Sequence, residues 1–551
     1  MTTATTIMSM WHSQLKIRLK ASRLLKGPEL ILLVAGLETY YVAGATYDSN
    51  THSVDDRCMP GTRVKVLKEA MRLIIAREGS HVIWISGTAG TGKTSIALSL
   101  CDMLAEPSGL TEQTVLLGGT FFLSRAKSSI KQEIARYIIP TLATVLVRNL
   151  PACEAALAAE LKKDPKFFVK TIKHQINNLL IIPLNSLEHF TRQVVFVIDG
   201  VDQCKDETQL RELVISLADF KCQVPVKFLI TSRPDTRIRK IRVHRPSLHP
   251  RIELYTQDLA LVTADIQHYI QKKFESSPAA PGWYADSDPA ELAGKAGGVF
   301  ATAVVTVKYI LSPIDSLRQK KRVREVKDLK AKGLDALNEM YAFMLNRTMN
   351  RSSSNREKAR LILTAIIASR TPQQVHTLAE LLGLSSFQIR EPLVDLQAVV
   401  FVPETNEVGE LLVLQMTFVE FLFKFAPVDV RVSESYGHDA LARGCLRRLA
   451  ADDLCFNVTK TKSSYDANPE SEPDIARSLR YASIAWPFHV YNASEPSKYD
   501  IQIDTVLRSK FLFWLELTSR IVEADHWSEL LLRAAAAKVR LYLKIHNVTT
   551  V

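Results

Sequence analysis

The sequence predicts an α/β domain, built on a parallel sheet flanked by helices, that is followed by mostly α-helical domains. Between residues 81 and 256, short apolar runs alternate with helical stretches, and this alternation is typical of parallel strands joined by helices. Residues 275–290 have the proline and glycine content of a linker, and beyond them the apolar spacing is mostly helical. A chain of 551 residues is too long for one domain, so we expect about three or four.

The first strand leads through a glycine-rich loop into a helix. Residues 81–86 are mostly apolar and predict a buried strand, and residues 94–100 predict the helix. The loop fits G-x-x-x-x-G-K-[ST], the phosphate-binding pattern known as Walker A. A chance turn rich in Gly and Thr would not be expected between such a strand and such a helix. The candidate nucleotide-binding residues here are Gly87, Thr88, Ala89, Gly90, Thr91, Gly92, Lys93, Thr94 and Ser95.

Each residue type in this loop suits a bound nucleotide. Glycines let backbone N–H groups close around phosphate oxygens, and the helix N-terminus adds a favourable dipole. Lys93 is placed to reach the β- and γ-phosphates, and the Thr94 hydroxyl is placed to ligate Mg²⁺. The sequence lacks the guanine-specific Asn-Lys-x-Asp pattern, which favours ATP or ADP, with GTP as the alternative.

A second strand ends in acidic residues. The apolar run 194–198 continues into Asp199, and Asp202 follows. A buried strand that ends in an acid is what the Walker B pattern requires. It would aim Asp199 at the Mg²⁺ and leave Asp202 to position water. The alternative is a strand that merely ends in an Asp turn.

A third strand ends in an arginine. The apolar run 226–231 continues into Ser232-Arg233-Pro234. Arg233 could face the γ-phosphate and report its presence, or it could be a surface arginine, and spacing alone leaves both open. Arg233 joins Asp199 and Asp202 as a candidate catalytic residue, and residues 252–254 predict the last strand.

The remaining segments predict mostly helices. Residues 64–75 follow a turn with helical spacing, and residues 292–311 predict one apolar helix or a broken pair. Residues 357–425 predict three helices, two short strands and a fourth helix from Met416, an order that fits a winged helix. Residues 466–474 are acidic and rich in proline, so we expect a disordered loop there.

These patterns divide the chain into five parts. The division is a helical leader (1–46), a P-loop NTPase domain (47–275), a helical domain with a linker (276–355), a winged-helix-like domain (356–426) and a C-terminal helical domain (427–551). The leader is basic and could be an amphipathic helix or a partly ordered extension.

The composition limits the partners and the compartment. The formal net charge of +12 comes from dispersed Lys and Arg without a base-reading motif, so we expect a solvated basic surface and no nucleic-acid partner. The seven cysteines are odd in number and show no C-x-x-C pair, which indicates thiols in a reducing, cytoplasmic compartment rather than disulfides or a zinc site. No apolar run is long enough to span a membrane.

Taken together, the motifs resemble those of the NACHT-type STAND NTPases, including the fungal NOD-like receptors whose core is a nephrocystin-3-like N-terminal domain. The resemblance covers roughly residues 40–520 and follows one order of motifs along the chain. The matching segments are Tyr47-Asp48-Ser49, Cys58-Met59-Pro60-Gly61-Thr62-Arg63, Ala89 to Lys93, Phe121-Phe122-Leu123-Ser124-Arg125, Val195 to Asp202, and Thr231 to Pro234.

The resemblance extends the list of candidate residues and shows two departures. It implies that Gly61, Thr62 and Arg63 contact the nucleotide. Gln415 stands where the family has a histidine that holds the diphosphate, and a glutamine can offer only a neutral hydrogen bond there. Gln203 stands where the family often has an acid, so we expect any hydrolysis to be slow.

The function that these features favour is a nucleotide-dependent switch. It would bind ATP or GTP with Mg²⁺ and couple the nucleotide state to domain rearrangement and self-association. The resemblance suggests fungal self/non-self recognition or programmed cell death as its setting. The alternatives are a turnover ATPase acting on nucleic acid and a scaffold that binds nucleotide without hydrolysis. Relatives often continue into repeats, so we expect a truncated or solo member.

Overall fold

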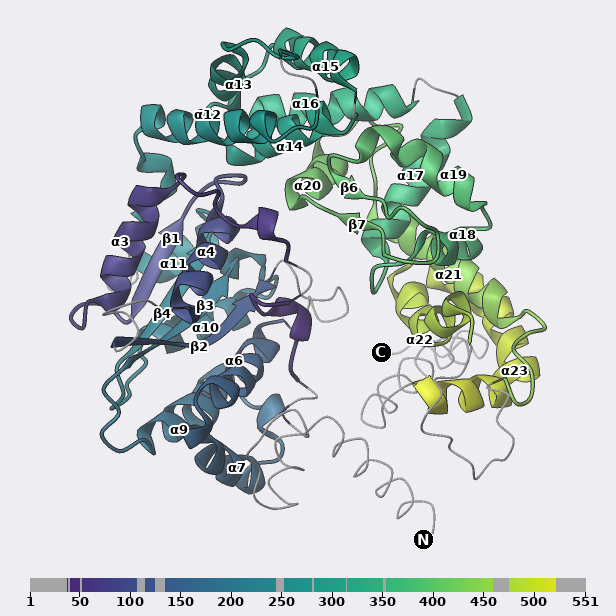
Figure 1. Ribbon diagram of the computed structural model, residues 1–551. Coiled ribbons are helices and arrows are strands. Elements are labelled where there is room, and N and C mark those ends of the chain that lie inside the picture. The colour runs from purple at the N-terminus through teal and green to yellow at the C-terminus, as the bar shows by residue number, and fades with distance from the viewer. Residues whose placement is uncertain are drawn as a thin grey trace.

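The computed structural model describes residues 37, 40–49, 52–106, 114–123, 134–243, 252–279, 282–313, 315–349, 353–458 and 475–521 (Figure 1). Most of the predicted leader lies outside these ranges. So do the acidic segment 466–474, Ser124 and Arg125 of the family motif, and the chain after residue 521.

Five parallel strands form the predicted sheet, in the order β2-β3-β4-β1-β5. The strands are β1 (Val82–Ser86), β2 (Val115–Phe122), β3 (Gln193–Asp199), β4 (Val226–Ser232) and β5 (Ile252–Glu253). Every residue of β1, β3 and β4 is buried, because helices cover both faces of the sheet. The strands predicted from the apolar runs are therefore confirmed.

The two faces of the sheet have separate cores. Ile83 and Ile85 of β1 pack with α3 (Val64–Ile75) and α4 (Lys93–Ala105). Val82 and Trp84 pack on the opposite face, because successive strand residues point to opposite sides. The helices of that face include α6 (Ala135–Asn149), α10 (Glu207–Ala218) and α11 (Thr236–Val243).

The chain between β2 and β3 forms a series of helices. Helix α6 ends at Asn149, because Leu150, the residue before Pro151, leaves the helical region with φ of −139° and ψ of 76°. The pieces that follow are α7 (Glu154–Lys163), α8 (Ile172–Ile176), a π-helical turn (Asn177–Ile181) and α9 (Ile182–Asn185).

The described helices differ in length and apolar character from membrane spans. None of them alone has the length and apolar character that a crossing needs. The pair Ala135–Asn149 and Pro151–Lys163 passes by length and composition, but with a bend of 117° between its halves. Both halves contribute buried residues to the core beside the sheet.

A group of helices follows the sheet and forms the top of the molecule in Figure 1. They are α12 (Leu259–Glu275), α13 (Asp288–Ala296), α14 (Phe300–Leu311), α15 (Ser316–Asp328) and α16 (Gly333–Met349). Of the two forms predicted for residues 292–311, the broken pair is the one found, with the break at Gly297 and Gly298. Both glycines have positive φ, 53° and 81°.

The predicted domain boundary at residue 275 differs from the packing. Val262, Ile266, Ile270 and Phe274 of α12 belong to one core with α13, α14 and α16. The apolar face of α12 is thus turned to the helices that follow it, and we call α12 to α16 the helical unit. A linker-like composition after α12 marks a loop inside that unit, not its edge.

The next unit has the element order predicted from the sequence. It consists of α17 (Ser353–Ala368), α18 (Val375–Leu382), α19 (Ser386–Arg390), β6 (Val400–Phe401), β7 (Leu412–Val413) and α20 (Met416–Lys424). Strands β6 and β7 pair antiparallel. We call this part the α17–α20 unit. Helices α21 (Glu434–Leu449), α22 (Arg477–Asn492) and α23 (Asp500–Ile521) complete the described chain.

All seven cysteines lie in the described ranges and all are free thiols. Cys445 is buried in α21, and Cys455 is exposed. The other five belong to the NTPase domain and are buried or partly buried: Cys58, Cys101, Cys153, Cys204 and Cys222. The expectation of unpaired thiols is confirmed.

Two glycines within helices, one exposed and one buried, predict opposite effects of the same substitution. A Cβ at Gly444 of α21 would overlap the carbonyl oxygen of Leu381, whereas a Cβ at Gly294 of α13 would meet nothing within 4 Å. Alanine favours a helix by about 1 kcal/mol over glycine, while overpacking costs about 1–3 kcal/mol. We expect Gly294→Ala to raise the urea midpoint and Gly444→Ala to lower it. A rise for both would contradict close packing of α21 on α18.

Candidate functional site

The glycine-rich loop continues directly from β1 and is tied to β4. The Gly87 N–H donates to the carbonyl oxygen of Ser232 at 3.1 Å. Gly90 and Gly92 have φ of 77° and 88°, in the left-handed region that favours glycine. Gly92 stands immediately before α4, so the loop delivers its N–H groups at the helix N-terminus.

Lys93 lies across the loop in the described structure. Its Nζ donates to the carbonyl oxygens of Gly87 at 2.7 Å and Thr88 at 2.9 Å. Desolvation lowers the pKa of Lys93 to about 8, although the nearby Asp202 and Asp199 carboxylates oppose this shift. A lysine whose charge is disfavoured by burial gains most from an anionic partner.

Asp199 is buried at the end of β3, with 1% of its surface exposed. It accepts hydrogen bonds from Thr94 Oγ1 at 2.9 Å and from Thr231 Oγ1 at 2.6 Å. Desolvation raises the pKa of Asp199, and the two hydroxyl bonds oppose that shift. Thr231, which also accepts from the Gly200 N–H at 2.9 Å, was not among the sequence candidates.

The oxygen atoms of Thr94 and Asp199 suit Mg²⁺. They are hard ligands, and Mg²⁺ is usually held by one or two protein carboxylates together with phosphate oxygens and water. Within the described ranges, no cluster of three or more His, Cys, Asp or Glu side chains could hold a metal ion by itself. The donors present therefore fit a magnesium ion that arrives with a nucleotide.

Asp202 and Arg233 lie beside this pair and are joined to each other. The Arg233 N–H donates to Asp202 Oδ1 at 3.0 Å, and the Arg233 side chain lies 3.7 Å from Asp202 Oδ2. Arg237 holds the same turn by donating to the Asp202 carbonyl oxygen at 2.7 Å. The structure thus brings the three candidate catalytic residues to one edge of the sheet.

The guanidinium of Arg233 bonds to a different part of the chain. Its Nη1 donates to Glu420 Oε2 at 2.8 Å and its Nη2 lies 2.5 Å from Glu420 Oε1, a bidentate ion pair between β4 and α20. Burial opposes the charge on Arg233, but the bond to Glu420 raises its pKa. Glu420 was not a sequence candidate, although it lies five residues after the candidate Gln415.

Gln415 lies at the start of α20. It is the residue before α20, is partly buried, and makes no side-chain hydrogen bond with the residues that the structure describes. Helix α20 instead meets the end of β4 through Glu420, which bonds to Arg233. A role for Gln415 in nucleotide binding stays a prediction.

The residues just before α3, Gly61 to Arg63, form a lead-in segment that contacts the glycine-rich loop at Thr91. Arg63 is 4% exposed, has φ of 55°, and donates from Nη2 to the Thr91 carbonyl oxygen at 2.8 Å. Its N–H donates to Asp265 Oδ2 at 2.9 Å, and its guanidinium lies 4.7 Å from the ring centroid of Phe300. Thr62 is buried next to it, and Gly61, with φ of 88°, lies under His268.

Asp265, His268 and Phe300 come from α12 and α14, and spacing in the sequence gave no signal for them. The Ala301 N–H also donates to the Gly90 carbonyl oxygen at 3.0 Å. Arg63 Nε is buried and has no hydrogen-bond partner among the described residues. The guanidinium of Arg63 is thus enclosed by the lead-in segment, the loop at Thr91 and helix α14.

This sheet, with its loop after β1 and Asp199 at the end of β3, has the arrangement of a P-loop NTPase. The chain contains a P-loop NTPase domain. The family described as "Nephrocystin 3, N-terminal" matches residues 61–233, which run from the lead-in to Arg233. The match covers less than half of the chain. A search of curated proteins finds no match.

Several solved structures are similar to this chain at low identity. A structure titled "Structural Basis for Katanin Self-Assembly" has 14% identity and a TM-score of 0.29, covering 55% of this chain and 92% of that one. A Drosophila ORC bound to DNA has 13% identity and a TM-score of 0.29, covering 76% and 94%. A Thermotoga maritima RuvB mutant has 15% identity and a TM-score of 0.24, covering 66% and 96%. Scores this low do not bear on function.

Lys93→Ala is expected to weaken Mg-nucleotide binding by at least about tenfold, because a charge-assisted phosphate contact contributes about 1.5–3 kcal/mol. A titration with a fluorescent ATP analogue measures the change. Lys65→Ala removes an exposed lysine of α3 and serves as the control. Equal affinities for Lys93→Ala and Lys65→Ala would contradict the placement of the phosphates in this loop.

Asp199→Asn is expected to leave nucleotide binding measurable but to remove its dependence on Mg²⁺, because the amide cannot neutralise the ion. Binding is measured with Mg²⁺ and with EDTA for each protein. The wild type should lose affinity in EDTA, whereas the variant should bind equally in both. A variant that keeps the wild-type response to EDTA would show that Asp199 does not hold the metal.

Proposed function

We propose that this protein is a nucleotide-dependent switch. It binds ATP, with GTP as the alternative, together with Mg²⁺, and the bound nucleotide governs the contact between the NTPase domain and the α17–α20 unit. The observation that carries this proposal is the ion pair between Arg233 and Glu420, which joins the two parts over a sequence separation of 187 residues.

The ion pair competes with a γ-phosphate for one side chain. Arg233 follows β4 and lies next to Asp202 and close enough to Lys93 to influence its charge. Guanidinium groups bind carboxylates and phosphates through the same pair of donors. A triphosphate therefore draws Arg233 away from Glu420, whereas a diphosphate leaves the ion pair in place.

The free energy of the ion pair suits a switch. The side chains of Arg233 and Glu420 are 33% and 35% exposed. A pair exposed to this degree contributes about 1 kcal/mol or less, which changes the ratio of two states by about fivefold. A nucleotide moves such an equilibrium only by the difference in its affinity for the two states, and one phosphate contact supplies a difference of this size.

The other end of the loop gives the helical unit a second contact with the nucleotide. Arg63 bonds to the loop at Thr91 and lies over Phe300 of α14. On this proposal the base end of the nucleotide lies near Arg63, and the bases of ATP and GTP are distinguished there. Release of the α17–α20 unit then exposes surface for self-association, and signalling in the cytoplasm follows from the assembled state.

Hydrolysis is the second function that the site supports. The Asp202 carboxylate faces the Lys93 region and can orient water, while Gln203 stands beside it and cannot serve as a base. We expect a slow NTPase, whose role is to reset the switch. Turnover measured with and without DNA separates this from an enzyme that acts on nucleic acid and from a scaffold without turnover.

Glu420→Gln tests the switch directly. The amide keeps the shape of the side chain but loses its charge, so Arg233 is released. Affinity for a non-hydrolysable ATP analogue should rise about fivefold, the affinity for ADP should stay the same, and self-association with the ATP analogue should need less nucleotide. Glu407→Gln, an exposed acid in the turn between β6 and β7, is the matched control.

An unchanged ratio of the two affinities in Glu420→Gln would contradict the proposal. The same result in both glutamine variants would assign any change to net charge alone. Arg233→Ala completes the set, because it removes the side chain for which Glu420 and the γ-phosphate compete, and it should abolish the difference between ATP and ADP.

A further inference from the structure

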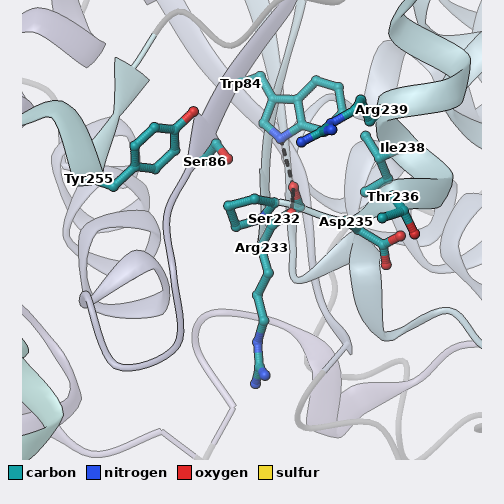
Figure 2. Close-up of a pocket in the computed structure, with 10 residues that line it drawn as sticks. Trp84, Ser86, Ser232, Arg233, Asp235, Thr236, Ile238, Arg239 and Tyr255 are labelled. Atoms are coloured by element: carbon teal, nitrogen blue, oxygen red, sulfur yellow. Dashed lines mark hydrogen bonds between the residues drawn. The ribbon is translucent and has the colours of Figure 1, made fainter. Parts of the chain in front are cut away.

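Helix α20 carries Glu420, the partner of Arg233, and it packs against helix α16 of the helical unit. In Figure 1, α20 lies beneath α16, on the side toward the sheet. Figure 2 shows the Arg233 side chain extending away from Trp84, and its guanidinium ends at Glu420. The ion pair therefore depends on the position of a helix that is distant in sequence from β4.

A buried tyrosine of α16 contacts α20 through its ring. Tyr341 has none of its surface exposed, and its ring packs edge to face on Phe418, with the ring centroids 5.1 Å apart. The ring of Phe421, also on α20, has its centroid 5.5 Å away. These rings hold α20 against α16. Because apolar contacts are not directional, however, they leave α20 free to turn slightly about its own axis.

A hydrogen bond constrains the rotation that these apolar contacts leave free. The hydroxyl oxygens of Tyr341 and Thr417 lie 2.7 Å apart, and either hydroxyl can donate. A hydrogen bond restricts both the distance and the angle between its groups. Thr417 lies in the first turn of α20, so this bond fixes the rotation of that helix about its axis.

Thr417 and Glu420 are three residues apart on α20, so they are neighbours on one face of the helix. Burial is the main cause that raises the pKa of Tyr341, and the Glu420 carboxylate adds to it. The same carboxylate opposes the effect of burial that lowers the pKa of Lys93. Glu420 is therefore near both the hydroxyl on α16 and the lysine of the glycine-rich loop.

Helix α16 is itself tied to the region of the loop. Its first residue, Gly333, has a carbonyl oxygen that accepts from Thr302 Oγ1 of α14 at 3.0 Å. The residue before Thr302 is Ala301, whose N–H donates to the Gly90 carbonyl oxygen of the loop at 3.0 Å. Tyr341 lies on the same helix as Gly333, roughly 12 Å farther along its axis. One helix thus connects the surroundings of the loop to Thr417 of α20.

From this arrangement we infer that Tyr341 is a positioning residue for the switch. Its hydroxyl, through Thr417, holds α20 at the rotation in which Glu420 meets Arg233. Loss of the hydroxyl lets α20 turn and weakens the ion pair, so Arg233 becomes more available to a γ-phosphate. The inference rests on the proposed function, and it names the group of the helical unit that regulates the contact between Arg233 and Glu420.

Tyr341→Phe tests this inference, because it removes the hydroxyl and keeps the ring. Affinity for a non-hydrolysable ATP analogue should rise about twofold to fivefold, the upper value corresponding to full release of the ion pair, while affinity for ADP stays the same. Thr417→Val removes the other hydroxyl with little change of shape and should act in the same direction. In Glu420→Gln, which has no ion pair left to weaken, adding Tyr341→Phe should change neither affinity further.

Tyr499→Phe is the matched control, because Tyr499 is a buried tyrosine outside α16 and α20 whose hydroxyl donates to the Asp439 carbonyl oxygen at 2.8 Å. An equal rise in Tyr499→Phe, an equal rise for the ATP analogue and ADP, or a rise that persists in Glu420→Gln would overturn the inference. Unchanged affinities in Tyr341→Phe and Thr417→Val, beside a raised affinity in Glu420→Gln, would overturn it and leave the proposed function standing. No effect of Glu420→Gln itself would contradict the proposed function and this inference with it.

Discussion

The pairing of β1 with β4 is the constraint on which the site depends. Because β4 lies between β1 and β3, the loop after β1, Asp199 after β3 and Arg233 after β4 meet at one edge of the sheet. Backbone and side-chain bonds fix this edge. The Gly87 N–H bonds to the Ser232 carbonyl oxygen, and Thr231 of β4 bonds to both Asp199 and the Gly200 N–H. Ligands of open α/β sheets bind at such carboxyl ends.

The helices after the sheet are held to one another by a large core, whereas the contact of α20 with the NTPase domain is weaker. A single hydrophobic core runs through the helical units from Val262 to Leu517, and each buried apolar side chain in it contributes about 1.5–3 kcal/mol. The contact of α20 with the NTPase domain includes an ion pair whose side chains are about one-third exposed. A bound nucleotide can therefore change the second contact without disturbing the first, and the helical units would respond together.

Two positively charged side chains beside the loop, Lys93 and Arg63, are buried at a cost in free energy. Lys93 is held by loop carbonyl oxygens and has a lowered pKa, and Arg63 combines a buried unpaired Nε with a left-handed backbone. Unfavourable features of this kind persist where the surrounding structure enforces them, and they are concentrated at functional sites. An anion in the loop would offset the cost of burying the Lys93 charge by attracting it, which is why we place the phosphates there.

The sequence by itself determined the local parts of this protein. The strands at 82–86, 193–199 and 226–232 and the loop with Lys93 and Thr94 follow from apolar runs and short spacings, because neighbours in the chain are fixed by backbone geometry. The tertiary structure alone decided which distant groups meet these residues. Glu420 meets Arg233, and Asp265 and Phe300 meet Arg63. These pairs join elements from separate units, and their contacts depend on how helix faces pack, which no spacing within one segment records.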